Sequence, residues 1–509
     1  RPLLLAVARL DAGSARLTPQ AAEERLRVLG YQDPAGALRH IEALTVGVSR
    51  RASIQRTLLP VLLGWFANAP EPDGGLLGFR RVSEALGSTH WYLGLLRDES
   101  AAAERMAQLL ASSRYATDLL LRAPDSVAML VDDHELTPRS RENLISEVQS
   151  AVGRYDDPDS AVAAIRALRR RELFRISAGQ LLHLNDVDAV ERALTDVSAA
   201  TLVGALDVSL SVAATEFQAP LPFAFAVIAM GRFGGHELGL GSDVDVMFVY
   251  DPHEGADPET AGRLAFQVAN DLRKRLMAQS NDPQLLIDAD LRPEGRQGPL
   301  VRTLDSYAAY YARWSAGWES QALLRAEFVA GDAQLGARFE EIIAPLRFPE
   351  GGLEPDQVRE IRRLKARMEA ERLPRGADPN LHTKLGRGGL SDVEWVAQLL
   401  QLQHAHSVPG LRTTRTLEAL EAACKADLIA REDVDALRTA WQFAARIRDA
   451  VMLVRAHASD LVPTDMRELR GIAYVLGYTP EDSGRVLEDY QRITRRARNV
   501  MERVFYDAG

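Results

Sequence analysis

Cysteine is nearly absent from this sequence. Cys424 is the single one among 509 residues, so no disulfide can form within the chain. We expect Cys424 to be a small core residue of a helix, and a chain without disulfides is typical of the reducing cytoplasm. Long apolar stretches are also missing: no run of about 18 apolar residues occurs, which excludes a membrane span.

A net positive charge is missing as well. The formal net charge is -10, which argues against a general nucleic-acid binder, because such proteins need a basic surface to neutralise phosphates. A small nucleotide remains allowed. Hydrophobic residues make up 46% and charged residues 26%, as in soluble globular proteins, and the length predicts two or three domains. The chain begins at Arg1 and shows no signal sequence, so we expect a fragment whose missing part lies upstream.

The hydrophobic pattern predicts mostly helices around a short stretch of strands. Apolar residues three and four apart indicate helices up to about residue 152 and again almost throughout the chain after Pro355. Between them the pattern predicts helices and buried strands: helices over 160–184, 189–215 and 259–278, and strands over 223–230, 243–250 and 285–291. We therefore predict a predominantly helical α+β protein with an N-terminal helical region, a catalytic domain and a C-terminal helical bundle, over 1–158, 159–345 and 346–509.

Two aspartates start the second predicted strand. Asp243 and Asp245 are two residues apart, so their carboxylates point to the same face of the strand. Neighbouring carboxylates are costly unless a cation neutralises them, and oxygen ligands suit Mg²⁺. Five glycines lie within Gly231-Arg-Phe-Gly-Gly-His-Glu-Leu-Gly-Leu-Gly-Ser242 just upstream, a pattern that lets the backbone approach phosphate closely. This glycine-rich loop is neither a P-loop nor a Gly-x-Gly-x-x-Gly motif.

A third acid is expected from the next strand, in Leu286-Ile-Asp-Ala-Asp-Leu-Arg-Pro293. Asp288 and Asp290 share one face, so spacing alone does not choose between them. Arg292 lies on that face too, where it either clamps a phosphate or pairs with the aspartates. Three further arginines in a row, Arg169 to Arg171, are interpreted as a solvated helix face, and His236 as structural or solvent-facing.

Four motifs in order resemble those of the glutamine synthetase adenylyltransferase/adenylyl-removing family, a branch of the polymerase-β-like nucleotidyltransferase superfamily. They span roughly the middle third of the chain. They are Ala229-Met-Gly-Arg-Phe-Gly-Gly-His-Glu-Leu-Gly-Leu-Gly-Ser-Asp-Val-Asp-Val-Met-Phe248, Ile287-Asp-Ala-Asp-Leu-Arg-Pro293, Trp318-Glu-Ser-Gln-Ala-Leu-Leu-Arg-Ala326 and Lys384-Leu-Gly-Arg-Gly-Gly-Leu-Ser-Asp-Val-Glu394. The family usually has lysine where Arg232 stands and a basic residue where Asp290 stands.

The resemblance implies a fold, a reaction and a set of partners. The expected fold has a small mixed sheet flanked by helical domains. The chain resembles the C-terminal half of the family enzyme, which moves AMP from ATP to a glutamine synthetase tyrosine and releases pyrophosphate. The alternatives are the N-terminal half, which removes AMP by phosphorolysis, and a non-catalytic regulatory module. A PII-type signal protein, glutamine and 2-oxoglutarate are implied as regulators, and neither nucleic acid nor a membrane is expected as a partner.

The resemblance also assigns roles to residues. Asp288 aligns with the third metal-binding acid, so Asp243, Asp245 and Asp288 are expected to hold two Mg²⁺ ions, with Asp288 as the candidate base. The nucleotide-binding residues are expected to be Gly231, Gly234, Gly235, Gly241, Ser242, Arg292 and Lys384. For Lys384 the alternative is a glycine-bounded helix start, over 386–389, with solvated charges.

Overall fold

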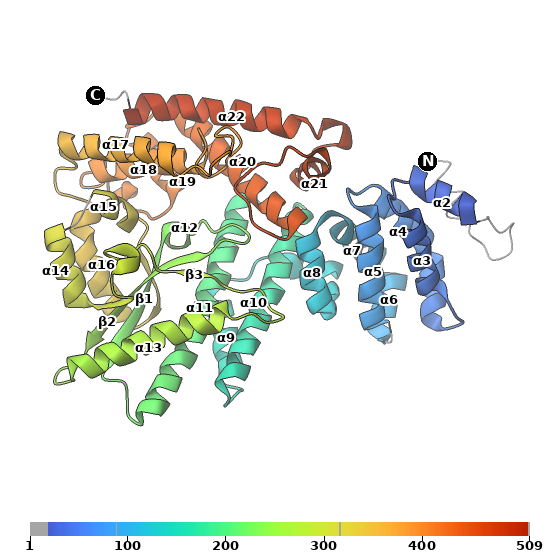
Figure 1. Ribbon diagram of the computed structural model, residues 1–509, viewed down its shortest axis with the longest axis horizontal. Helices are drawn as coiled ribbons and strands as arrows, with labels where there is room; N and C mark the ends of the chain where they lie inside the picture. Colours follow the sequence, from blue (N-terminus) through green and yellow to red (C-terminus); the bar gives the residue numbers. More distant parts are fainter. Residues whose placement is uncertain (1–18, 88, 315–316, 507–509) are drawn as a thin grey trace.

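The computed structural model describes residues 19–87, 89–314 and 317–506. The chain begins with short helices that pack side by side at one end of the molecule (Figure 1). These are α2 Pro19–Val28, α3 Pro34–Thr45, α4 Arg50–Ala67, α5 Pro72–Leu86, α6 His90–Asp98, α7 Ser100–Ser112, α8 Arg114–Arg122, η1 Pro124–Val131 and η2 Asp133–Leu136. The next helix, α9 Arg141–Val152, packs instead on the two long helices that follow it. The helical start predicted from the sequence is confirmed over the described residues.

Two long helices lead from this region to the sheet. They are α10 Pro158–Leu181 and α11 Val187–Phe217, each within two or three residues of its predicted bounds. Among the described residues, α11 alone has the length and composition that would suffice to cross a membrane. Of its most apolar window, 67% is buried inside the protein, which accounts for the composition without a membrane.

Within the described residues the sheet has five strands in the order β3-β2-β1-β5, with β4 beside β2. β1 Phe223–Met230 is antiparallel to β2 Val244–Pro252 and to β5 Glu327–Gly331, while β3 Ile287–Asp288 and β4 Val301–Thr303 are parallel to β2. The prediction for β1 is confirmed at both ends. The third predicted strand, over 285–291, is shorter than expected, because the chain turns away after Asp288.

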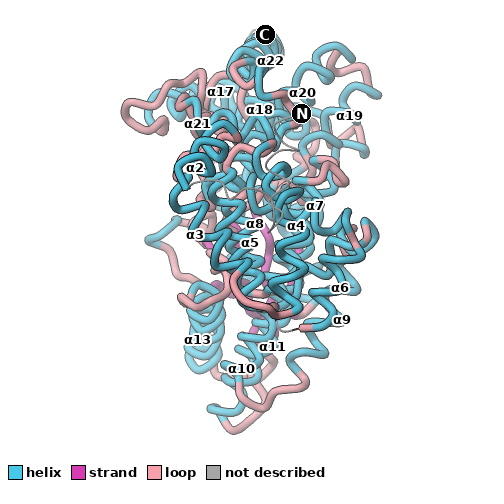
Figure 2. Tube along the Cα trace, turned by 90° about the vertical axis from the view of Figure 1, so that its right-hand side faces the viewer, coloured by secondary structure: helices cyan, strands magenta, loops and turns pink. Residues whose placement is uncertain are grey.

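Helices cover both faces of this sheet, because alternate strand residues are apolar on both sides. One face, with Ile228 and Met247, packs on α14 Leu304–Trp314 and α16 Ala333–Arg347. The other, with Val227 and Phe248, shares its core with α11 and α13 Pro258–Met277. Figure 2 shows the strands enclosed by helices. The fold is the predicted α+β arrangement with a small mixed sheet.

The remaining helices close over the end of the sheet that carries α12 Gly231–Gly234 (Figure 1). They are α15 Gly317–Leu323, α17 Pro355–Glu371, α18 Leu390–His404, α19 Thr416–Lys425, α20 Arg431–Arg455, α21 Met466–Leu476 and α22 Arg485–Met501. Cys424 lies half-buried in α19. A continuous cluster of buried apolar side chains runs from Leu26 through the sheet to Phe505, so the three predicted regions share one core.

Candidate active site

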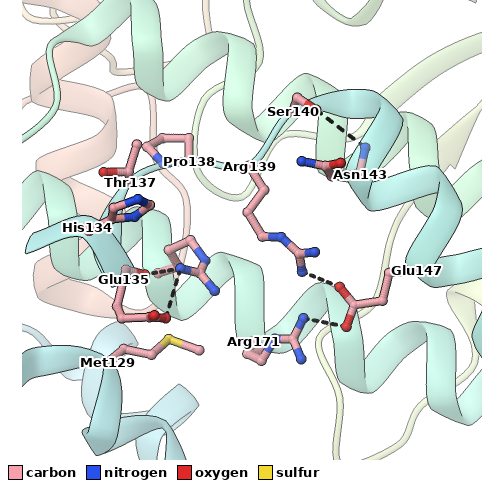
Figure 3. Close-up of a pocket in the computed structure, with 11 residues that line it drawn as sticks. Met129, His134, Glu135, Thr137, Pro138, Arg139, Ser140, Asn143, Glu147 and Arg171 are labelled. Carbon is pink, nitrogen blue, oxygen red and sulfur yellow. Dashed lines mark hydrogen bonds and ion pairs between the residues drawn. The ribbon is translucent and has the colours of Figure 1, made fainter. Parts of the chain in front are cut away.

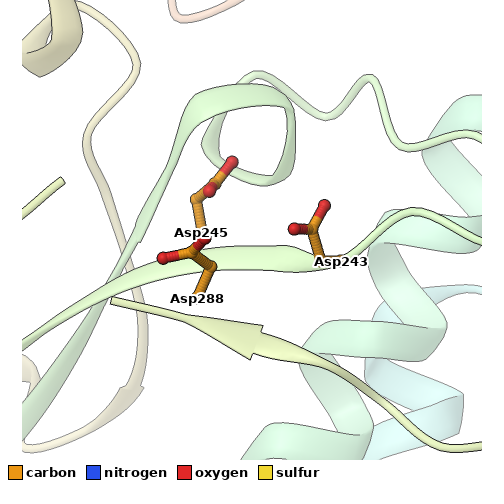
Figure 4. Close-up of side chains that lie close together, drawn as sticks. All are labelled: Asp243, Asp245 and Asp288. Carbon is orange, nitrogen blue, oxygen red and sulfur yellow. The ribbon is translucent and has the colours of Figure 1, made fainter. Parts of the chain in front are cut away.

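Three carboxylates meet at one end of the sheet (Figure 4). Asp243 directly precedes β2, Asp245 is the second residue of β2, and Asp288 ends β3, where it is the register partner of Asp245. One oxygen from each lies within 4.8 Å of the others. Asp243 is exposed and the other two are partly buried. The structure therefore brings together the three acids that the sequence and the family resemblance select.

The cluster is electrostatically strained without a cation. Burial, followed by the charge of Asp243 and then of Asp288, raises the pKa of Asp245 to about 7, although Lys384 and Arg325 act in the opposite direction. Three oxygen ligands that repel one another fit a hard divalent cation such as Mg²⁺. The residues present therefore suit the metal that the family resemblance implies.

Gly231 is required by the aspartates themselves. Met230, at the end of β1, is the register partner of Asp245, and Gly231 follows with a φ of +53°. A Cβ atom at Gly231 would overlap the Asp245 carboxylate. The absence of a side chain lets the carboxylate lie against the backbone, a reason that the sequence alone did not distinguish from phosphate approach.

Gly234 and Gly235 are packed against backbone carbonyls. A Cβ atom at Gly234 would overlap the carbonyl oxygen of Arg325, and one at Gly235 would lie 3.2 Å from that of Thr414. Both glycines are buried. Close packing is therefore sufficient to explain them, and their predicted contact with phosphate stays a prediction.

Gly241 and Ser242 shape the turn that enters β2. Gly241 is exposed with a φ of +74°, and Met452 of α20 lies beside it. The Ser242 hydroxyl accepts a hydrogen bond from the Gly239 amide at 3.2 Å, which closes the turn. Both residues lie directly before Asp243, and their predicted contact with phosphate stays a prediction.

A buried side chain of helix α20 is hydrogen-bonded to the backbone of the glycine-rich loop. Asp449 is buried, and its Oδ1 accepts a hydrogen bond from the Leu240 amide at 2.8 Å. Burial raises the pKa of Asp449, while this amide hydrogen bond lowers it. An acid more than 200 residues away in the sequence thus fixes the backbone beside the aspartates. The sequence analysis missed it, because a lone aspartate within a helix gives no signal.

Lys384 lies in the loop before α18, and its positive charge interacts with the aspartate cluster. Lys384 is exposed and makes no ion pair with another described residue. Its charge lowers the pKa of Asp245 and that of Asp460. A free ammonium group beside the acid cluster favours the predicted phosphate contact over a solvated helix start.

The glycines after Lys384 serve packing. Gly388 has a φ of +70°, and a Cβ atom there would overlap the carbonyl of Thr494 in α22. The Gly388 amide donates to Asp392 at 2.7 Å. Buried Asp392 also pairs with Lys365 at 2.6 Å and with Arg498 at 3.1 Å. The loop that carries Lys384 is thus anchored by a buried charge cluster.

Arg325, from the third motif, links the sheet to the C-terminal helices. Its guanidinium is buried and pairs with Glu237 at 2.8 Å and with Glu394 at 3.4 Å. Glu237 in turn accepts a hydrogen bond from the Thr416 amide at 2.6 Å. Residues from three motifs therefore form one buried network behind the site.

Arg232, where the family usually has lysine, is embedded in the same region. It donates to Glu191 at 2.9 Å and stacks over the Trp441 ring at 5.4 Å. Burial raises the pKa of Glu191 to about 8, an effect that Arg232 partly offsets. The planar guanidinium thus stacks and pairs at once, which a lysine does less well.

The Arg292 guanidinium is hydrogen-bonded to backbone carbonyls of its own loop. Its nitrogens donate to the carbonyl oxygens of Ala289 at 2.7 Å and Gly298 at 3.1 Å, and Asp290 lies 3.6 Å away. Asp290 pairs with Arg296 at 2.5 Å. This geometry favours the second alternative, in which Arg292 supports the turn after Asp288 and does not present a free fork to phosphate.

The arginines of α10 are not a solvated face, so that interpretation was wrong. Arg169 is buried and donates to the carbonyl of Pro283 at 3.1 Å, and Arg166 donates to that of Asp282 at 3.0 Å. These bonds hold the segment that leads into β3 and Asp288. His236 is structural: its Nε2 lies 2.6 Å from Glu327 of β5.

Other cavities lie elsewhere in the fold. One of about 620 Å³ is lined by η2, α9 and α10, and the aspartates do not border it (Figure 3). Arg139 and Arg171 point into this cavity, and Glu147 pairs with both. Its charges are already matched within the protein.

Comparison with known proteins gives two matching family models. A model described as glutamate-ammonia ligase adenylyltransferase matches residues 103–342, and one described as GlnD PII-uridylyltransferase matches residues 359–505. Relatives named bifunctional glutamine synthetase adenylyltransferase/adenylyl-removing enzyme occur in several bacteria. The Streptomyces avermitilis relative is 58% identical over 525 aligned positions, covering 100% of this chain and 52% of the relative.

Two more relatives with the same name repeat this coverage. The Streptomyces coelicolor relative is 58% identical over 521 positions, covering 99% of this chain and 52% of its own length. The relative from Mycobacterium tuberculosis strain H37Rv is 50% identical over 493 positions, covering 96% of this chain and 49% of its own length. The chain thus spans about half the length of the curated relatives it matches.

Proposed function

This chain belongs to the glutamine synthetase adenylyltransferase/adenylyl-removing family, and we propose that it transfers AMP from ATP to a tyrosine hydroxyl of glutamine synthetase, releasing pyrophosphate. The observation that carries the proposal is the cluster of three carboxylates within 4.8 Å at the end of the glycine-rich loop. An unpaired Lys384 beside this cluster adds the positive charge that a triphosphate requires.

The three acids, Asp243, Asp245 and Asp288, would hold two Mg²⁺ ions. Bound Mg²⁺ would supply charge neutralisation for the triphosphate and for the leaving pyrophosphate. Gly231 keeps the Asp245 carboxylate against the backbone, and the parallel pairing of β2 and β3 fixes Asp288 beside it.

The chain's own groups would then act on the tyrosine and on ATP. A free phenol has a pKa of about 10, so its proton must be accepted as its oxygen attacks, and Asp288 is the candidate acceptor. The phenol oxygen bonds to the α-phosphorus, and the bond from that phosphorus to the bridging oxygen breaks. Pyrophosphate leaves with those electrons, and Lys384 would contact its charge. Gly241 and Ser242 would line the phosphate path.

The adenylylating, C-terminal half is the assignment we favour. The chain carries one catalytic motif and spans about half of its relatives' length, as one half of a two-site enzyme would. The adenylyl-removing half would use the same acids with inorganic phosphate. A PII-type signal protein, glutamine and 2-oxoglutarate as regulators, and a cytoplasmic location, belong to the same proposal. A non-catalytic module is disfavoured, because it would not need the three acids to converge.

The test is incubation with Mg²⁺, ATP labelled at the α-phosphate and unmodified glutamine synthetase. Asp245→Asn should abolish labelling of the synthetase, while Asp251→Asn, a matched change at the other end of β2, should leave it. No label, with phosphate-dependent release of ADP from adenylylated synthetase, would assign the chain to the other half. If the chain shows neither of these two activities, the proposal is refuted.

A further inference from the structure

Positive charge is concentrated on part of the C-terminal helices of this acidic chain. Residues 355–389 form α17 and the loop after it, and residues 485–501 form α22. Together they contain 14 lysines and arginines against 7 aspartates and glutamates. The whole chain has a net charge of -10, so these two segments differ in sign from the rest of the protein.

Several arginines of these segments are exposed, and their side chains make no ion pair or hydrogen bond with another described residue. We call them the basic surface; they are Arg363 and Arg367 on α17, Arg372, Arg375 and Arg387 in the loop, and the pair 495–496 on α22. Arg363 and Arg367 are four residues apart, so they share one face of their helix. The guanidinium groups of the basic surface are therefore free to bind an anionic partner.

Ion pairs hold α17 and α22 together. Arg498 of α22 pairs with Glu369 of α17 at 2.9 Å. Buried Asp392 of α18 pairs with Lys365 of α17 at 2.6 Å and with Arg498 at 3.1 Å. Both helices run along the top of the molecule in Figure 1. The arginines of the basic surface therefore belong to one packed unit on one side of the protein.

The loop after α17 connects the basic surface to the three acids. Lys384 lies three residues before Arg387, and its positive charge interacts with Asp245. The same loop packs on α22, because Gly388 lies against the backbone of Thr494. A molecule held by the arginines around this loop would therefore lie beside the acid cluster.

The residue types of the basic surface favour an acidic polypeptide over a nucleic acid or a membrane. Proteins that bind single-stranded nucleic acid stack its bases on exposed aromatic side chains. Residues 355–389 contain no Phe, Tyr or Trp, and Tyr490, the only one on α22, is buried. Helices that lie on a membrane insert apolar side chains, and neither segment exposes a large hydrophobic residue. Exposed Glu360 and Glu371 lie among the arginines and would repel a uniformly charged polyanion.

We propose that the basic surface docks an acidic segment of the protein substrate and so brings the acceptor hydroxyl to the three acids. Attraction between opposite charges speeds the encounter, and paired arginine–carboxylate hydrogen bonds orient the docked segment. The remainder of the chain is acidic and repels the same segment, which directs it to this surface. The inference rests on the proposed function and adds which part of the protein recognises the substrate.

Steady-state labelling with α-labelled ATP, Mg²⁺ and varied unmodified glutamine synthetase tests the docking. The double variant Arg363→Glu, Arg367→Glu should raise the KM for glutamine synthetase about tenfold, with kcat, the KM for ATP and the melting temperature unchanged. Added NaCl should narrow the difference in KM between wild type and variant, because salt screens exposed charges. The matched control is Arg263→Glu, an exposed arginine of α13 without an ion pair to another described residue, and it should change none of these values.

The double variant Arg495→Gln, Arg496→Gln on α22 should raise the same KM, and it replaces the first variant should that one not fold. Labelling by the wild type with an unchanged KM for glutamine synthetase in the folded variants would overturn the docking and leave the proposed function standing.

Binding of poly-L-glutamate to Asp245→Asn, which cannot transfer AMP, tests recognition without catalysis. The polymer should bind, and adding Arg363→Glu and Arg367→Glu should weaken its binding about tenfold. If the wild type labels nothing, the proposed function fails and this measurement alone decides the docking. Polyglutamate binding that the added changes do not weaken, or tighter binding of duplex DNA or phosphatidylserine vesicles, would overturn it.

Discussion

Replacing Asp245 with asparagine should stabilise the cation-free protein while abolishing AMP transfer. The Asp245 carboxylate lies close to those of Asp243 and Asp288 and against Gly231. Burial, followed by the charges of Asp243 and Asp288, raises its pKa to about 7. Asparagine keeps the shape of the side chain and removes the charge. The substitution therefore separates the electrostatic cost of the site from its packing.

The size of the effect follows from the pKa of Asp245. A rise from an ordinary value of 3.8 to about 7 corresponds to roughly 4 kcal/mol at pH 8, because a tenfold change in acidity is about 1.4 kcal/mol. The folded state binds the proton more tightly than the unfolded state, so stability falls as pH rises from about 4 to 7. At pH 5 the cost is about 2 kcal/mol, since the folded carboxyl is then protonated.

Thermal melting in EDTA at pH 5 and pH 8 measures the difference. We expect Asp245→Asn to melt higher than the wild type at pH 8, by roughly 4 °C, and this difference in melting temperature to narrow at pH 5. Adding Mg²⁺ should raise the wild-type melting temperature more than that of the variant. The control is Asp251→Asn on the same strand. The Asp251 carboxylate pairs with Arg338 at 2.5 Å, so this variant should not melt at a higher temperature than the wild type. If Asp245→Asn is no more stable than the wild type at pH 8, the acids do not strain the fold.

Three further changes test the parts around the acids. Lys384→Ala should raise the KM for ATP about tenfold, a loss of about 1.4 kcal/mol of binding free energy, with an unchanged melting temperature. An unchanged KM, or the same rise in the exposed control Lys425→Ala, would show that Lys384 is not part of the site. Gly231→Ala should abolish AMP transfer and cost about 1–3 kcal/mol of stability, because a Cβ at φ +53° overlaps the Asp245 carboxylate. The control Gly255→Ala, at φ +79°, has open space for a Cβ and should keep its activity. Asp392→Asn should destabilise the fold by about 3–5 kcal/mol, since it removes the buried charge that pairs with buried Lys365 and with partly buried Arg498. A loss below about 1 kcal/mol on chemical denaturation would contradict that account.

Local pattern predicted much of the fold. A continuous apolar run bounded by proline and glycine located β1 at its observed ends, and the helical periodicity gave α10, α11 and α13 within a few residues. The third strand was predicted too long. Asp288 Oδ1 accepts from the Asp290 amide at 2.7 Å, and this side-chain hydrogen bond turns the backbone out of the sheet.

The acids of the site were predictable and their supports were not. Two-residue spacing on a strand places Asp243 and Asp245 together, and the family resemblance selected Asp288. The residues that hold the site have no local signature. Asp449 lies within an ordinary helix, and the charges of Arg166 on α10 resemble those of any solvated helix face until the fold brings them to backbone carbonyls.

The same contacts explain why the three clustered acids depend on helices far along the chain. The glycine-rich loop contains five glycines, which supply no polar side chain to fix its backbone, although Phe233, Leu238 and Leu240 of the loop pack in the core. Its backbone is held instead by Asp449 through the Leu240 amide and by Glu237, which pairs with Arg325 and caps α19 at Thr416. Each of these bonds is buried, where a lost partner is costly. The sheet therefore carries the acids, but the C-terminal helices determine the shape of the loop beside them, so a change in those helices can alter that loop without touching an acid.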